Sequence, residues 1–124
     1  MPGLTGCSSA SSLAVYKTGV VNKRLQVPVN LFSSSAVQIV RPAGWYYDIA
    51  VEKKENNTYK ALLMQCTHQS NQLTVTGSGF TCSLHGSQFD KDGNVRKGPA
   101  EEALTHYKVY KQNDYLIIEV PTTP

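Results

Sequence analysis

The sequence predicts an all-β protein. Short runs of β-branched and aromatic residues recur from Val15 onward, and turn-forming residues separate them. No window of a dozen residues shows the spacing of about 3.6 that marks an amphipathic helix. With 124 residues, 40% of them hydrophobic, the chain suffices for one compact domain. It is too short for a large oxygenase or dehydrogenase with separate cofactor and substrate lobes.

The expected elements follow the chain in order. Residues 1–14 are rich in small and polar side chains without apolar periodicity, and we expect a flexible tether there. A single domain is expected over 15–121, and 122–124 form a tail. Strands are expected at 25–32, 37–40, 46–53, 59–65, 72–76, 80–81, 88–89, 95–96, 106–111 and 115–120. One short helical turn is expected at 101–104.

Turn chemistry supports four of the connections between these strands. Residues 55–57 include two asparagines, which tolerate left-handed backbone, and 77–79 include two glycines. The Asp-Gly pair at 92–93 suits a two-residue hairpin, and 112–114 would close the last pair of strands. We therefore expect hairpins at these points.

The charge pattern argues against two classes of partner. Twelve Lys and Arg against nine Asp and Glu give a net charge of +3. These basic residues are scattered and accompany no nucleic-acid-binding motif, so we expect no nucleic-acid partner. The longest purely apolar stretches have three or four residues, far below the roughly 18 that a transmembrane helix needs. We expect no transmembrane helix, and any membrane attachment would come through a tether.

Two cysteines and two histidines form two mixed pairs in the middle of the chain. Cys66 and His68 are separated by one residue, Cys82 and His85 by two, and thirteen residues lie between the pairs. A hairpin that turns at 77–79 would bring the two pairs side by side. Two thiolates and two imidazoles would then converge on one metal site.

The pattern Cys-x-His, a spacer and Cys-x-x-His-Gly resembles the Rieske family of iron–sulfur proteins. The resemblance implies a 2Fe-2S cluster, with Cys66 and Cys82 on one iron and His68 and His85 on the other. Gly86 follows the second histidine, as the family pattern requires. With two thiolates the oxidised core is formally about neutral, against about minus two with four, and this eases the addition of an electron.

The resemblance extends beyond the ligands. It continues through 86–90 and the turn at 92–93 to 98–100, which is similar to the proline loop that covers the cluster in this family. The implied fold is a Rieske-type antiparallel β-sandwich. Its base of antiparallel strands would come from both ends of the chain, and a cluster-binding lobe would be inserted at 64–100.

The residues around the ligands imply an intermediate to fairly high potential. Ser87 matches a serine whose hydroxyl bonds to a bridging sulfide in high-potential relatives, but Phe89 replaces their hydrogen-bonding tyrosine. Asn71 and Leu84 stand where those relatives have a disulfide between the ligand loops. Leu84 and the backbone near Pro99 would shield the cluster from water.

The implied function is one-electron transfer without catalysis of its own. A redox protein or a quinol-linked complex would dock at the tip that carries His68 and His85. One alternative is a ferredoxin component that supplies an oxygenase, against which Ser87 argues. A complete oxygenase site is excluded because only His106 remains for a mononuclear iron. From another class, a zinc-stabilised interaction module stays open, although zinc sites usually pair like ligands.

The third cysteine has a separate interpretation. Residues 4–7 end at Cys7 and resemble the lipobox of bacterial lipoproteins, and 8–12 resemble their tether. Six residues precede Cys7, with no basic or apolar leader, and we favour trimming of the chain as the reason. This hypothesis places the protein at the bacterial cell envelope or periplasmic side, lipid-anchored, whereas an accidental match would leave it cytoplasmic.

Overall fold

The computed structural model describes residues 14–124, and in that range it is built almost entirely of strands. The elements, in chain order, are β1 (Val15–Thr18), β2 (Arg24–Pro28), the 3₁₀ helix η2 (Val29–Ser33), β3 (Val37–Pro42), β4 (Ile49–Lys53), β5 (Tyr59–Leu63), β6 (Thr74–Thr76), β7 (Gly79–Thr81), β8 (Gln88–Asp90), β9 (Val95–Lys97), β10 (His106–Tyr107), β11 (Val109–Gln112) and β12 (Tyr115–Glu119). The all-β fold class is confirmed. Within the described range, no helix has the length and apolar character needed to cross a bilayer.

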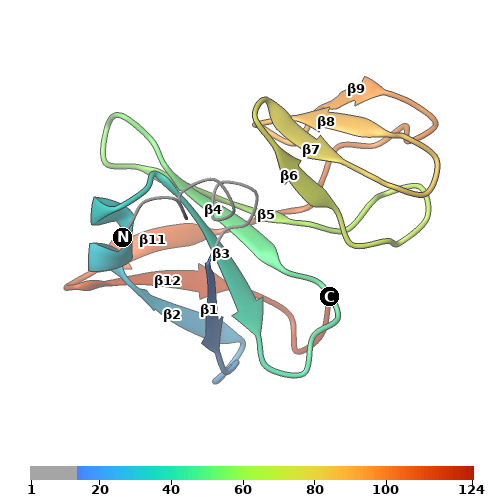
Figure 1. Cartoon of the computed structure of the whole chain (residues 1–124). Helices are drawn as coiled ribbons and strands as arrows, with labels where there is room; N and C mark the ends of the chain where they lie inside the picture. Colours follow the sequence, from blue (N-terminus) through green and yellow to red (C-terminus); the bar gives the residue numbers. More distant parts are fainter. Residues whose placement is uncertain (1–13) are drawn as a thin grey trace, which may run out of the picture.

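Two sheets pack face to face and form the base of the molecule (Figure 1). One has the order β1-β3-β4-β5-β10 and the other the order β11-β12-β2. Alternate side chains of the larger sheet, such as Val40 and Val51, point toward the smaller sheet and meet Leu25, Leu116 and Ile118. The base therefore encloses an apolar core between its two sheets.

A third sheet, with the order β6-β7-β8-β9, forms a separate lobe (Figure 1). The intervening side chains of the larger base sheet, Ile39, Ala50 and Leu62, point away from the base core because neighbouring strand residues face opposite sides. They pack against lobe residues that include Phe80 and Phe89. We use "lobe" for this sheet with its loops 64–73, 82–87 and 98–105.

The hairpins expected from turn chemistry are present, but the loop between β8 and β9 has four residues instead of the expected two. Strands β6 and β7 pair around 77–78, β8 and β9 around 91–94, and β11 and β12 around 113–114. Asn113 has a φ of 56°, in the left-handed region that asparagine tolerates. A side chain at Gly79 would collide with the carbonyl oxygen of Phe89, so this close strand pairing requires glycine.

The expected strand at 25–32 is wrong in its second half. The β2 strand ends at Pro28, and Val29–Ser33 form the 3₁₀ helix. The hydroxyl groups of Ser33 and Ser34 donate to carbonyl oxygens three residues earlier, at 2.8 and 3.2 Å. These local bonds satisfy backbone groups that a strand would pair with a neighbour.

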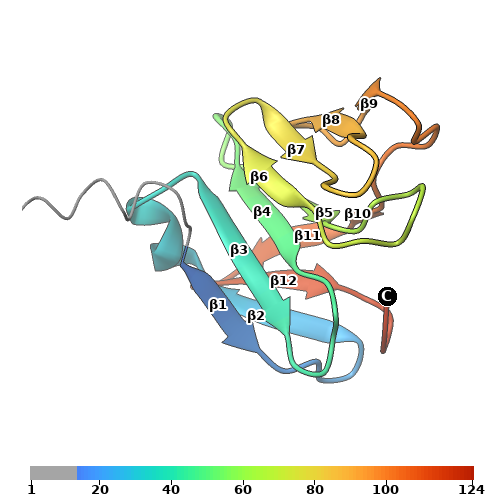
Figure 2. The ribbon, with the colours of Figure 1, turned by 45° about the vertical axis from the view of Figure 1, so that its right-hand side comes forward.

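The base also differs from an all-antiparallel arrangement. Strand β1, which the sequence patterns did not indicate, pairs in parallel with β3, and Val15 lies opposite Ile39 (Figure 2). The expected strand at 106–111 is divided into β10 and β11, which join different sheets. This division lets the chain pass from one sheet of the base to the other.

Residues 101–104 form no helical turn, contrary to expectation. The backbone amide of Leu104 donates instead to the carbonyl of Gly93 at 2.8 Å. Leu104 is buried among the apolar residues of the lobe. A long-range bond to the β8–β9 turn therefore replaces the local bonds of a helix.

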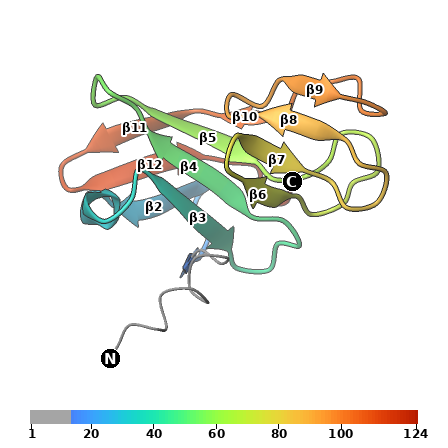
Figure 3. The same ribbon diagram turned by 45° about the horizontal axis from the view of Figure 1, so that its top comes forward.

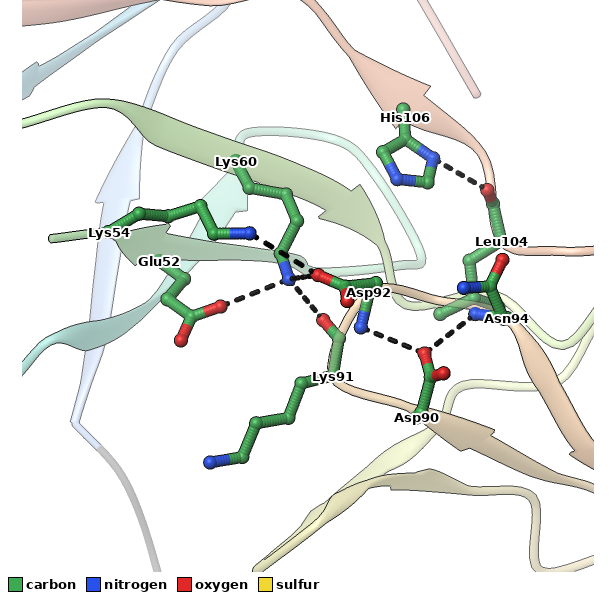
Figure 4. Close-up of polar contacts among 9 residues, drawn as sticks. All are labelled: Glu52, Lys54, Lys60, Asp90, Lys91, Asp92, Asn94, Leu104 and His106. Atoms are coloured by element: carbon green, nitrogen blue, oxygen red, sulfur yellow. Dashed lines mark hydrogen bonds and ion pairs between the residues drawn. The ribbon is translucent and has the colours of Figure 1, made fainter. Parts of the chain in front are cut away.

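An ion-pair cluster ties the β8–β9 turn of the lobe to the base (Figure 4). The ammonium group of Lys60, on β5, lies 2.6 Å from a carboxylate oxygen of Asp92 and 3.0 Å from one of Glu52. It also donates to the carbonyl of Lys91, and Lys54 lies 3.4 Å from Asp92. The Lys60 side chain is only 11% exposed, so these bonds are partly shielded from solvent.

Candidate metal centre

Two loops of the same local design form one end of the lobe, side by side (Figures 1 and 3). In the first loop, Cys66 N–H donates to the Asn71 carbonyl at 2.8 Å, and Ser70 N–H donates back to the Cys66 carbonyl at 2.9 Å. In the second, the same two bonds join Cys82 with Ser87 at 2.8 Å and with Gly86 at 3.0 Å. Each cysteine therefore begins a closed turn of equal length.

Both turns need left-handed backbone at the fourth residue after the cysteine. The φ angles there are 50° at Ser70 and 81° at Gly86. Glycine adopts this conformation without steric cost, whereas serine does so with some strain. In the first loop, the Tyr47 hydroxyl donates to the Ser70 carbonyl and ties that residue to the base.

The four sequence-predicted ligands lie together at this end. Cys66 and Cys82 are 1% and 2% exposed, and the Cys66 thiol is a hydrogen-bonding neighbour of the Cys82 sulfur. The rings of His68 and His85 stand edge to face with centroids 5.5 Å apart, and both residues are exposed. Sulfur donors thus lie inside the lobe and nitrogen donors at its surface.

The Cys82 sulfur lies in a setting that favours the thiolate. Burial alone would raise the pKa of this thiol, but hydrogen bonds hold the pKa below its ordinary value. The donors are the backbone amide of Leu84, the Cys66 thiol, the His85 amide and the Asn71 side chain. The thiolate is the form of cysteine that binds metal, so this setting is compatible with a ligand role for Cys82.

The four donors are grouped in two pairs. Within residues 14–124, no three Cys, His, Asp or Glu side chains converge on a single point as the ligands of one ion would. The donors come instead as one pair of thiols and one pair of imidazoles. A binuclear core takes two protein ligands on each iron, and one pair of thiols with one pair of imidazoles is a donor set that fits a 2Fe-2S group.

A buried serine provides a second fit to such a group. Ser87 is 0% exposed, and its hydroxyl oxygen accepts a hydrogen bond from the backbone amide of Ala100 at 3.0 Å. In the described part of the chain, the hydroxyl group donates no hydrogen bond to another protein atom. That proton is available to an acceptor in the site, such as an inorganic sulfide.

The remaining candidates have different settings. Leu84 is 54% exposed beside His85, and Pro99 is exposed next to Ala100. Phe89 is buried opposite Phe80 in the lobe. Cys7 and nearly all of the expected tether lie outside the described residues.

One contact at the site was not expected from the sequence. The side-chain amide of Asn71 lies 3.9 Å from the Cys82 sulfur and so reaches from the first loop to the second. The available signal was its position, which matches that of a bridging cysteine in high-potential relatives. His106 lies on β10 of the base sheet, opposite Leu62 of β5, and its Nδ1 lies 3.1 Å from the Leu104 carbonyl oxygen (Figure 4).

Comparison with known proteins agrees with this geometry. A family model described as the Rieske [2Fe-2S] domain matches residues 17–108. The cytochrome b6-f complex iron-sulfur subunit 1 of Nostoc sp. (strain PCC 7120) is 33% identical over 72 residues, 56% of this chain and 40% of that subunit. Subunit 2 of the same complex and strain is 32% identical over 59 residues, 46% of this chain and 33% of its own length. The matched stretch therefore spans less than half of these relatives.

Solved structures share the fold. The cyanobacterial plasma membrane Rieske protein PetC3 from Synechocystis PCC 6803 superposes with a TM-score of 0.62 at 20% identity, covering 75% of this chain and 95% of that one. A chain from the complex of reduced oxygenase and oxidized ferredoxin in carbazole 1,9a-dioxygenase gives 0.57 at 19%, covering 80% and 94%. With the family match over residues 17–108, these findings establish that the chain belongs to the Rieske [2Fe-2S] domain family, whose cofactor is a 2Fe-2S cluster.

Proposed function

We propose that Cys66, His68, Cys82 and His85 are the protein ligands of the Rieske cluster through which this chain transfers single electrons. The observation that carries the proposal is the meeting of two buried thiols and two exposed imidazoles, with ring centroids 5.5 Å apart, at the end of one lobe. When bound, the cluster supplies reversible one-electron chemistry. The protein would act as a carrier, without catalysis of its own.

The two kinds of ligand would have different tasks. The buried thiols of Cys66 and Cys82 keep water from the sulfur side of the site. The exposed rings of His68 and His85 offer the shortest path between the site and a docked partner. Leu84, which is exposed, would contribute apolar surface beside them, and Pro99, exposed on the adjacent loop, would cover the site. A redox protein or a quinol-linked complex would bind at this tip.

The hydrogen bonds to the site favour an intermediate to fairly high reduction potential. Ser87 offers a hydroxyl proton, whereas Phe89 has no hydroxyl to donate toward Cys66. One hydrogen bond that favours the reduced form by about 1 kcal/mol raises a one-electron potential by about 40 mV. The proposed potential lies above that of low-potential Rieske ferredoxins and below that of quinol-oxidising subunits.

The proposed domain organisation is the one that the sequence predicts. Residues 15–121 would form the single Rieske domain, with 64–100 as its cluster-binding lobe. A lipid on Cys7, within the expected tether 1–14, would attach the domain to the bacterial cell envelope. Mass spectrometry of the protein from a bacterial membrane fraction tests this part, because an unmodified Cys7 that still follows Gly6 removes the anchor.

The ligand proposal is tested by metal analysis and spectroscopy of the purified chain. We expect two iron and two sulfide per chain, a coloured oxidised form, and an electron paramagnetic resonance (EPR) signal after reduction that indicates mixed His and Cys ligation. A colourless protein with one zinc would support the interaction module instead. His106→Ala is a suitable control, because this residue lies outside the site and its loss should leave the spectrum unchanged.

A further inference from the structure

The Ser87 hydroxyl occupies an unusual position between two parts of the lobe. It lies at the end of the second ligand loop, directly before β8, and it is 0% exposed. A hydroxyl group has one proton to donate and two lone pairs to accept with. One lone pair is used by the amide of Ala100 at 3.0 Å, while the hydroxyl group donates no hydrogen bond to another protein atom in the described range.

The Ala100 amide is held in place by strand pairing. Gln88 pairs with Lys97, so the chain leaves β9 beside the start of β8. Residues 98–100 then pass next to Ser87, where Pro99 has no amide proton and Ala100 supplies the one that reaches the hydroxyl. Ala100 is 4% exposed, so water does not compete freely for this bond.

We propose that the Ala100 amide tunes the reduction potential through Ser87, without contacting the cluster. By donating to the serine oxygen, the amide fixes the rotation of the hydroxyl group and polarises it. A hydroxyl that accepts one hydrogen bond donates a stronger one, by about a tenth to a third in condensed phases. This inference rests on the proposed function, in which the Ser87 proton bonds to the cluster.

The direction of the effect follows from charge. Reduction adds an electron to the site, and a donated hydrogen bond stabilises the more negative state. The Ala100 amide strengthens the bond that Ser87 donates, so it favours the reduced form. The loop at 98–100 would thus affect the potential through one peptide amide, in addition to covering the site.

The test replaces the Ala100 amide by an ester, using lactic acid at position 100, in wild-type and Ser87→Ala backgrounds. In the wild-type background we expect the ester to weaken the preference for the reduced form by up to about 1.7-fold, which is about 13 mV at 59 mV per factor of ten. Ser87→Ala alone should lower the preference for the reduced form by about fivefold, which lowers the midpoint potential by about 40 mV. In the Ser87→Ala background the ester should cause no further shift.

A matched control uses the ester at Leu104, whose amide donates to Gly93 at 2.8 Å within the same lobe but away from Ser87. This control should reduce stability and leave the midpoint potential unchanged. The proposal is overturned if the ester at 100 acts like the control, or if it shifts the potential equally with and without Ser87. Ala100→Pro, which also removes the amide proton, provides a second variant.

Failure of the ligand assignment would show separately, as a wild-type EPR signal without histidine ligation.

Discussion

The base and the lobe of this protein are stabilised in different ways. Five strands of the base, β2, β3, β4, β5 and β12, have five or six residues, and their alternating apolar side chains close a core between two sheets. The four strands of the lobe have three residues each. The core of the lobe includes Cys66 and Cys82 and is completed by Ile39, Ala50 and Leu62 of the base.

The base and the lobe therefore have different tasks: the base stabilises the fold, and the lobe carries the candidate metal centre. The strands of the base bury each other's apolar side chains in a core of their own. The lobe depends on close turns, on the face of the base beneath it and, in our proposal, on the cluster that Cys66 and Cys82 bind. We therefore expect changes in the lobe to affect the cofactor first, and changes in the base to affect the whole molecule.

The largest effect is expected from Cys82→Ala. Removal of one proposed thiolate ligand should abolish the cluster, because the neighbouring donors offer no replacement sulfur. We expect loss of iron, sulfide and colour, with faster amide hydrogen exchange in β6–β9. Amides of β2 and β12 should stay protected from exchange. Unfolding of the base in this variant would contradict the expectation that changes in the lobe affect the cofactor first. A variant that keeps its full iron content would remove Cys82 from the ligand set.

Ile49→Ala tests the base, as Cys82→Ala tests the lobe. Ile49 is fully buried in the base core, so truncation leaves a cavity. We expect the free energy of unfolding to fall by about 2–5 kcal/mol, measured by denaturant titration. Because the lobe packs on the base, both regions should unfold in one transition. A variant in which the lobe survives loss of the base would show that the lobe folds independently.

Lys60→Met removes the charged link between the two regions while keeping an apolar stem. We expect the free energy of unfolding to fall by about 1–2 kcal/mol, since Lys60 bonds to Asp92, Glu52 and a carbonyl group from a partly buried position. The faster hydrogen exchange that results should be concentrated in the β8–β9 turn. Lys108→Met is a control at an exposed lysine outside this cluster. Equal losses in the two variants would mean that the link contributes nothing specific.

The same link predicts a pH dependence. The bond and charge of Lys60, followed by those of Lys54, hold the pKa of Asp92 below its ordinary value. Its contribution to stability is therefore complete above the unfolded pKa of about 4, and it is lost as pH falls through the lower folded value. Burial lowers the pKa of Lys60, but bonds to Asp92 and Glu52 outweigh burial and raise it. The contribution of the Lys60 ion pairs to stability is lost as pH rises through the raised pKa of Lys60. Lys60→Met should therefore flatten both the acid and the alkaline flank of the plot of stability against pH.

Part of this structure was predictable from local sequence. The strands of the base alternate apolar and polar residues, and the turns at 77–79, 92–93 and 112–114 carry the residues that hairpins require. The Cys and His spacing similarly indicated one site formed by two loops. These features depend on residues that are close together in the chain.

Features that depend on distant residues were not predictable. Strand β1 has four residues and acquires its place only by parallel pairing with β3. Residues 29–32 are mostly apolar, as in a strand, but serine hydroxyl groups that follow them favour a 3₁₀ helix. The contact between Ser87 and Ala100 spans thirteen residues, and no local pattern encodes it.

Phe89→Tyr should change the redox chemistry and leave the base unaffected. Phe89 replaces the tyrosine of high-potential relatives, and the added hydroxyl would donate toward the sulfur of Cys66. We expect the midpoint potential to rise by about 40 mV, measured by redox titration, for a bond of about 1 kcal/mol. Phe80→Tyr, at the paired position in the same core, is the matched control. An equal shift in both variants would assign the effect to general polarity.

The smallest effect is expected from Asn71→Leu. The Asn71 amide is 3.9 Å from the Cys82 sulfur, at the outer limit of a bond to sulfur, so its contribution is weak. We expect the midpoint potential to fall by less than the 40 mV of a full hydrogen bond. Asn94→Leu, on the distant β8–β9 turn, should leave the potential unchanged. A rise in the Asn71 variant would mean that this side chain does not donate to the site.

The central claim is that histidine nitrogen and cysteine sulfur from two neighbouring loops bind the same cluster. Pulsed EPR of the reduced protein, with histidine labelled selectively by nitrogen-15, tests it most directly. The account predicts strong hyperfine couplings from two histidine nitrogens, both altered by the label and both retained in His106→Ala. A reduced signal without histidine coupling would contradict the account, as would a purified chain that binds zinc in place of iron.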